Sequence, residues 1–304
     1  MSLRKTKKQA QPESKIYIGS KVFDVFLILF MLILSVIFLY PFLNVVATSL
    51  SSNRMITTGQ VTFFPRELMV DGYKMLFKEQ NILGAYWNTI VIAVGTMVIS
   101  LSLTSLMAYV MMVPDFVLRK QLSVFLLITM FFSGGTVPTY LLIQNLGLYN
   151  SWWSLILPNA VTAYNVFVYR SFYKGISPEI REAARIDGAG DLKILTKIYV
   201  HLSKALYATF GLFSVVGVWN SYYEALLYIK DPGKQPIQML LRKIVFTSGT
   251  ANMADSQQMI SNGAMNQLNV QYACVIATIG PILLVYPFIQ KYFAQGMQVG
   301  AVKG

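Results

Sequence analysis

The sequence predicts an all-α protein that crosses a membrane six times. Of its 304 residues, 55% are hydrophobic and 12% are charged, whereas soluble globular proteins carry about 25% charged residues. The mean hydropathy is +0.53. Six apolar stretches approach or exceed the length that a membrane-spanning helix needs, which is about 20 residues. This composition argues against a soluble enzyme, a disordered chain and a disulfide-stapled secreted domain.

The chain begins with a basic segment, residues 1–21, that holds six Lys or Arg residues and one acid. The apolar run that follows is too long for the hydrophobic region of a signal peptide, so we expect an uncleaved first spanning helix. The other spans are set by the same length criterion. In order, the predicted spans are residues 22–47, 87–112, 122–144, 151–169, 205–227 and 271–290.

The positive charge is distributed unevenly between the segments that connect the spans. With a cytoplasmic N-terminus, the inner segments hold 17 of the 25 Lys and Arg residues, and the outer segments hold 8 although they are together longer. The positive-inside rule therefore places both termini in the cytoplasm of a protein of the cell membrane. The predicted domains are a basic arm at 1–21, a six-helix transmembrane domain at 22–290 with a cytoplasmic loop at 170–204, and a cytoplasmic tail at 291–304.

Local patterns refine two of these regions. Ser133–Pro138 contains two glycines and interrupts the third span, which indicates either a pathway lining or a packing kink. Outside the membrane, a short helix is expected from about Pro236 to Phe246, with proline in its first turn.

The residues that support most catalytic sites are scarce. The chain has one cysteine, Cys274, and one histidine, His201, which makes a catalytic triad or a His-rich metal site hard to build. No glycine loop followed by Lys and Ser or Thr is present to cradle a nucleotide phosphate. We therefore expect no enzyme activity, metal or cofactor in this chain.

The cytoplasmic loop before the fifth span predicts a helix, a tight turn and a second helix. Ser177 is a good N-cap, and Pro178 suits the first helical position. Small and apolar residues then recur at helical spacing, which forms a face that another protein could approach closely. Gly188 fits the position just past a helix end, where a positive φ is favourable, and a second helix can begin near Asp191.

This loop resembles the Glu-Ala-Ala loop of binding-protein-dependent ABC importer permeases. The matching positions are Glu182, Ala183, Ala184, Asp187, Gly188 and Ala189. The resemblance runs from about Lys15 to Gly304 and includes Trp219 with Asn220 and the last five residues, which are similar to the tails of carbohydrate-importer permeases. It implies the type I ABC importer permease architecture, in which the loop is a coupling helix that docks on a separate ATPase.

The resemblance also implies the partners and the activity. They are a second homologous permease, a dimer of ABC ATPases that binds ATP and Mg²⁺, an extracytoplasmic solute-binding protein and the lipid membrane, with no nucleic acid. The implied activity is ATP-driven import of an oligosaccharide. The sequence departs from the family pattern where two prolines usually follow the loop, because His201 and Ala205 stand there.

Polar and aromatic residues inside the predicted spans mark a candidate substrate pathway. Glu224 is the only acid well inside a span, and ionisable residues there are functional candidates. Its neighbours offer aromatic faces and hydrogen-bond partners that suit sugars. An interfacial aromatic belt and hydrogen bonds between helices are the alternatives. The candidate pathway residues are Trp219, Asn220, Tyr223, Glu224, Asn159 and Asn165.

An ATP-independent secondary transporter is the alternative function. Such a protein needs ion-coupling residues near the membrane centre and internal repeats. Glu224 alone gives weak support, and no internal repeat is recognisable in the sequence.

Overall fold

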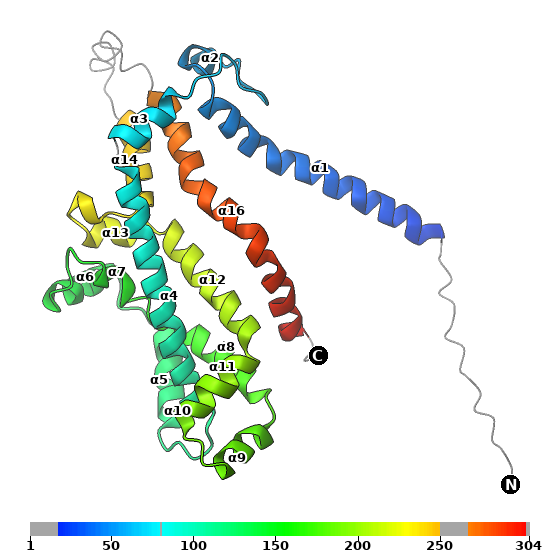
Figure 1. Ribbon diagram of the computed structural model, residues 1–304, viewed down its shortest axis with the longest axis vertical. Helices are drawn as coiled ribbons and strands as arrows, with labels where there is room; N and C mark the ends of the chain where they lie inside the picture. Colours follow the sequence, from blue (N-terminus) through cyan, green and yellow to red (C-terminus); the bar gives the residue numbers. More distant parts are fainter. Residues whose placement is uncertain (1–17, 80, 250–266, 302–304) are drawn as a thin grey trace.

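The computed structural model describes residues 18–79, 81–249 and 267–301, all of them in helices or in the turns and loops between helices (Figure 1). The basic arm predicted at 1–21 lies almost entirely outside these residues. Three helices in the described part of the chain are long and apolar enough to cross a membrane: α1 (Ile18–Ser49), α4 (Ile82–Met112) and α16 (Gln267–Ala301). They coincide with the first, second and sixth predicted spans.

The remaining helices are shorter and connect or cap the three long ones. They are α2 (Asn53–Thr57), α3 (Asp71–Glu79), α5 (Arg119–Phe131), α6 (Thr136–Asn145), α7 (Trp153–Ile156), α8 (Ala163–Lys174), α9 (Pro178–Ile186), α10 (Asp191–Ile194), η1 (Leu195–Tyr199), α11 (Val200–Leu202), α12 (Lys204–Asn220), α13 (Tyr223–Tyr228), η2 (Pro232–Lys234) and α14 (Ile237–Gly249). The helix expected near Pro236–Phe246 corresponds to α14.

Six continuous spans are not confirmed. The described residues contain three candidate spans, or up to five if two sharply bent helix pairs each count as one. In the third predicted span, α5 and α6 meet at 118°, because Gly135 between them has a φ of 86°. The fourth is divided into α7 and α8 by a stretch that contains Pro158, which cannot donate a helical hydrogen bond.

Two further boundaries differ from the prediction. The fifth predicted span is divided between α12 and α13, which are separated by Ser221 and Tyr222. The segment before α12, Asp191–Leu202, meets α12 at an angle of 86°. At the C-terminal end, α16 continues as one helix to Ala301, so helix runs through most of the residues that were predicted as a separate tail.

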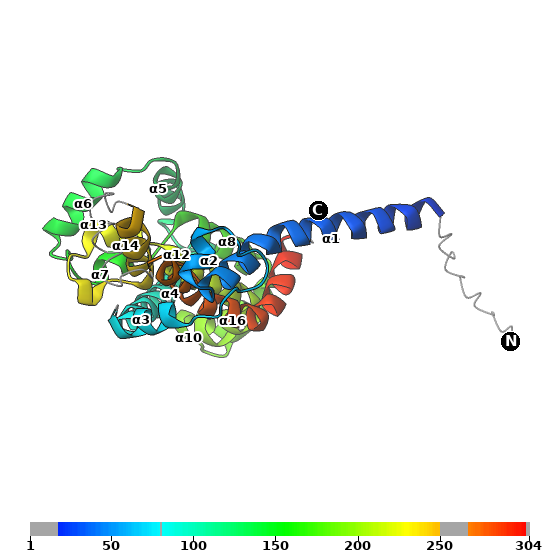
Figure 2. The same ribbon diagram turned by 90° about the horizontal axis from the view of Figure 1, so that it is seen from above.

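Helix α4 lies at the centre of the bundle. It packs against α8 and α12, and α16 packs against α1, α3, α12 and α14 (Figures 1 and 2). Several polar residues are buried along these long helices. Two of their hydroxyls bond to the carbonyl of the preceding turn, those of Thr89 to Ala85 and of Thr278 to Cys274, so these two donors are satisfied within their own helices.

Helix α1 leaves the rest of the molecule and projects away from it (Figure 2). Its apolar side chains from Phe23 to Phe38, apart from the half-buried Leu34, are exposed around the helix. Its last turns are held to the molecule, where Asn44 Nδ2 donates to the carbonyl of Thr62 at 2.9 Å and Ala47 is buried. A lone apolar helix of this kind needs lipid or another protein around it.

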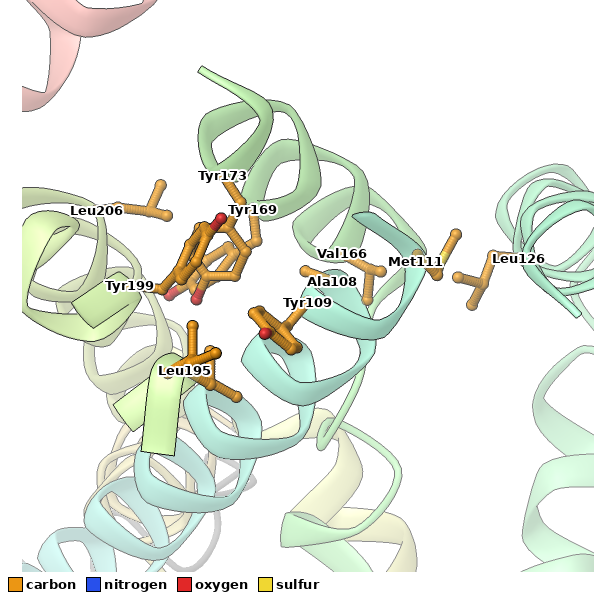
Figure 3. Close-up of a cluster of buried hydrophobic side chains, with 11 residues drawn as sticks. Ala108, Tyr109, Met111, Leu126, Val166, Tyr169, Tyr173, Leu195, Tyr199 and Leu206 are labelled. Atoms are coloured by element: carbon orange, nitrogen blue, oxygen red, sulfur yellow. The ribbon is translucent and has the colours of Figure 1, made fainter. Parts of the chain in front are cut away.

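A cluster of buried aromatic residues fills the end of the bundle near α9 (Figure 3). Tyr169, Tyr173 and Tyr199 are almost completely buried. The hydroxyl of Tyr173 bonds to Ser105 Oγ at 2.9 Å and to Tyr207 Oη at 2.7 Å, and Ser105 also bonds to Tyr207. The buried hydroxyl of Tyr169, in contrast, has no hydrogen-bond partner among the described residues.

Two neighbouring tyrosines should respond differently to loss of the hydroxyl. Tyr173→Phe removes two buried hydrogen bonds and should destabilise the protein by about 1 kcal/mol or more. Tyr169→Phe removes an unpaired buried hydroxyl and should leave stability unchanged or raise it. Thermal unfolding of the purified protein checks both variants. An equal loss of stability in the two variants would contradict this assignment.

Candidate functional site

Helix α9 and the turn after it have the predicted local structure. Pro178 is in the first turn of α9, and Gly188 has a φ of +77°. The amide of Gly188 donates to the carbonyl of Arg185 at 3.0 Å, and that of Ala189 donates to Ala184 at 2.9 Å. These paired bonds are typical of a Schellman motif, which needs a left-handed residue such as glycine at its centre. The second helix, α10, begins at Asp191 as predicted.

The six predicted coupling residues divide between two faces. Ala184 and Ala189 are half-buried and pack against the tyrosine cluster. The other four are exposed, and they are Glu182, Ala183, Asp187 and Gly188. The side chain of Ile186 is 87% exposed beside them, although the sequence did not single it out. One face of α9 is thus anchored, and the other presents small and apolar groups together with two carboxylates to the surroundings.

A polar contact fixes this loop to α4. Tyr109, near the end of α4, donates its hydroxyl to Asp191 Oδ1 at 2.8 Å. Arg185 Nη2 lies 3.1 Å from Asp191 Oδ2. Arg181, whose side chain is largely buried, lies 3.5 Å from Asp191 Oδ1 and donates from Nε to Tyr109 at 3.4 Å. We call these four residues the loop anchor.

The loop anchor favours the charged form of its carboxylate. The hydrogen bond from Tyr109 lowers the pKa of Asp191, although partial burial acts in the opposite direction. The charges of Arg185 and Arg181 lower this pKa further. Asp191 therefore stays ionised, and its contacts should persist at any pH above its ordinary pKa.

Ring contacts continue from the loop anchor into the bundle. Tyr109 packs edge-on against Tyr199 with ring centroids 5.3 Å apart, and Tyr199 packs against Tyr173 at 5.2 Å. Tyr173 contacts Tyr169 at 6.1 Å, and Tyr169 contacts Phe210 at 5.1 Å. Figure 3 shows the four tyrosines gathered between α4, α8 and the segment before α12. Such edge-to-face pairs are favourable beyond the area that they bury.

Phe210, the last ring of this series, lines a cavity of about 330 Å³. Helices α4, α7, α8, α12 and α13 contribute to its wall. Three predicted pathway residues line it, namely Asn159, Asn165 and Glu224. Asn159 Nδ2 donates to Glu224 Oε2 at 2.9 Å, so two side chains far apart in sequence meet in one polar group at the cavity wall.

The other three predicted pathway residues lie outside this cavity. Trp219 is buried, and its Nε1 donates to the carbonyl of Thr278 at 3.0 Å. Asn220 is exposed and donates to the carbonyl of Val216 within its own helix. Tyr223 is also exposed. The break after Asn220 gives α13 its own direction, so residues that a continuous helix would group together are separated.

Several hydroxyl residues of the cavity wall are not among the residues predicted from the sequence. They are Thr96, Ser100, Thr162, Ser214 and Ser221. Thr96 and Ser100 are four residues apart on α4 and so share one side of that helix, and this spacing is the signal that could have identified them. The hydroxyl of Thr96 is buried and has no partner among the described residues.

Comparisons with known proteins identify the family. The family described as "Binding-protein-dependent transport system inner membrane component" matches residues 98–299, more than half of the chain. The polygalacturonan/rhamnogalacturonan transport system permease protein YtcP of Bacillus subtilis (strain 168) is 36% identical over 285 residues, which cover 94% of this chain and 99% of that protein.

Two solved structures are similar in fold. One is a chain of a bacterial ABC transporter involved in the import of the acidic polysaccharide alginate, with a TM-score of 0.84, 28% identity, and coverage of 92% of this chain and 100% of that chain. Another belongs to a bacterial alginate ABC transporter in complex with an alginate pentasaccharide-bound periplasmic protein. Its TM-score is 0.53 and its identity is 14%, and the match covers 90% of this chain and 95% of that chain. As the residues around Glu182 predict, the chain belongs to the family of inner membrane components of binding-protein-dependent transport systems.

Proposed function

We propose that this chain is the permease subunit of an ATP-driven importer for an oligosaccharide. The observation that carries the proposal is the position of α9, which is anchored on one face, exposed on the other, and joined to the cavity wall by ring contacts. Membership of the transport family supports it. The chain itself makes and breaks no covalent bond in this proposal.

An oligosaccharide fits the chemistry of the cavity. The wall offers hydroxyl groups, two side-chain amides and the carboxylate of Glu224, and these groups can donate to and accept from sugar hydroxyls. Phe210 and Phe213 add aromatic surface. The names of the relatives point in the same direction, since YtcP is named for polygalacturonan and rhamnogalacturonan and the solved transporter for alginate.

Three protein partners follow from the proposal. An ABC ATPase dimer, which binds ATP and Mg²⁺, docks on the exposed face of α9 around Ala183 and Ile186. A second, homologous permease covers part of the exposed apolar surface of α1. A solute-binding protein delivers substrate at the opposite end of the bundle, as suggested by the alginate transporter crystallised with its periplasmic protein.

The proposed cycle is alternating access. Closure of the ATPase dimer on ATP moves α9. Because Arg181 and Ala184 hold α9 to α4 and to the tyrosine cluster, the helices around the cavity move with it and open the cavity outward. Release of the hydrolysis products then returns the subunit to its inward-facing state.

The proposed orientation places α9 and both termini in the cytoplasm, in agreement with the positive-inside rule. Phe64, between α2 and α3, is 79% exposed, and Leu192 of α10, outside the proposed docking face, is 67% exposed. In Figure 1, α2 and α3 lie at the opposite end of the bundle from α10. In whole cells, a membrane-impermeant thiol reagent should label Phe64→Cys and leave Leu192→Cys unlabelled, and both variants should react after the membrane is permeabilised. Labelling of Leu192→Cys alone in intact cells would reverse the orientation.

The docking role of α9 is tested at Ala183. Ala183→Asp places a charge in a contact that the ATPase buries, and an unpaired buried charge costs several kcal/mol. The variant should insert and pair with the second permease, but it should lose ATPase co-purification and ATP-driven uptake. Ala183→Ser is the matched control and should retain both. Normal uptake and ATP hydrolysis by Ala183→Asp in proteoliposomes would remove the main support for the proposal.

The cavity is tested by comparing two polar residues near the end of α12. Glu224 lines the cavity, whereas Asn220 lies outside it. Glu224→Ala should reduce oligosaccharide uptake about tenfold, the effect of losing one hydrogen bond to a charged group. Asn220→Ala should leave uptake unchanged, and both complexes should assemble normally. Equal uptake by the two variants would place the pathway elsewhere.

A further inference from the structure

Two arginines lie on adjacent helices at the α9 end of the bundle. Arg119 begins α5, and Arg170 is in the last part of α8. The two helices pack side by side, and Leu126 of α5 and Val166 of α8 belong to one buried cluster (Figure 3). Arg170 follows Val166 by about one helical turn, and Arg119 precedes Leu126 by about two. Both arginines therefore lie on the packed sides of their helices.

Among the described residues, no acid lies against the two guanidinium groups. Both side chains are half-buried, and Nε of Arg170 is shielded from solvent and has no hydrogen-bond partner within the same residues. In the described part of the chain, neither arginine belongs to an ion pair. The charge of Arg119 also acts on Arg170 repulsively. Partial burial of two like charges is costly unless an anion joins them.

We propose that Arg119 and Arg170 bind the phosphate of an anionic phospholipid. Arginine forks bind phosphate oxygens through pairs of charge-assisted hydrogen bonds, and basic pockets between spanning helices are known to take acidic headgroups. Leu127 and Met130 of α5 are exposed apolar residues, and by helical periodicity they lie on the same half of α5 as Arg119. They provide a surface for the acyl chains of a lipid whose headgroup lies at the start of α5.

The site is independent of the coupling and transport roles proposed above. None of the residues that hold the phosphate belongs to the loop anchor or the cavity wall. The proposed orientation decides only which leaflet supplies the lipid, and the binding itself can be measured in detergent without ATP. A failure of the lipid proposal would therefore leave the proposed function standing, and the reverse also holds.

The test is retention of lipid by the purified complete transporter. The complex is reconstituted in nanodiscs of phosphatidylglycerol or phosphatidylcholine and extracted into detergent, and bound lipid is counted by native mass spectrometry. The parent should retain phosphatidylglycerol in preference to phosphatidylcholine. Arg119→Gln and Arg170→Gln should each reduce this retention about tenfold, the effect of losing charge-assisted hydrogen bonds. Arg170→Lys keeps the positive charge but loses the paired N–H donors of the guanidinium group. This variant should therefore retain an amount of phosphatidylglycerol between those of the parent and of Arg170→Gln.

Lys120→Gln is the matched control because Lys120 is the exposed neighbour of Arg119 and the charge change is the same. It should retain lipid as the parent does. The proposal would be overturned if Lys120→Gln lost as much phosphatidylglycerol as the arginine variants do. It would also be overturned if the parent retained phosphatidylglycerol and phosphatidylcholine equally. Two other outcomes would also overturn it. One is saturable binding of inorganic phosphate at the arginines with no preference for anionic lipid, and the other is normal lipid retention with loss of a partner subunit in the arginine variants.

Discussion

The hydrogen bond from Tyr109 to Asp191 is the interaction on which the α9 end of the molecule depends. Tyr109 belongs to α4, the central helix of the bundle, whereas Asp191 begins the helix after the Gly188 turn. Arg181 and Arg185 reach the same carboxylate from α9. Because a single carboxylate joins three elements, moving the loop away from α4 breaks contacts with Tyr109 and with two arginines. Separating these partners leaves partly buried charges uncompensated, which is unfavourable.

The tyrosine cluster extends this constraint into the bundle. Its rings contact one another from Tyr109 to Phe210, and Phe210 is part of the cavity wall. Closely packed rings transmit displacement because protein interiors have few voids in which it could be absorbed. The described residues therefore contain a continuous line of contacts between the proposed docking face and the proposed substrate cavity.

The parts of the structure that the sequence predicted are those that local patterns determine. Long apolar runs predicted α1, α4 and α16. Pro178 in the first turn and Gly188 just past the end predicted α9 and the turn that follows it. The broken spans carry local signals, such as Gly135, but the direction of the chain after each break depends on packing between distant segments. For the same reason, no local pattern could pair Tyr109 with Asp191 or place Trp219 against Thr278 rather than in the cavity.

The breaks in the helices and the polar cavity are one structural feature. Backbone without helical hydrogen bonds is tolerated at membrane depth only where protein or a water-filled cavity satisfies it. Asn159 lies in the break between α7 and α8, and its amide donates both to the carbonyl of Leu155 at the end of α7 and to Glu224. Glu224 follows the break after α12. The same side chain thus satisfies a carbonyl near the break and positions the carboxylate at the cavity, so an unbroken helix in either place would remove the polar site.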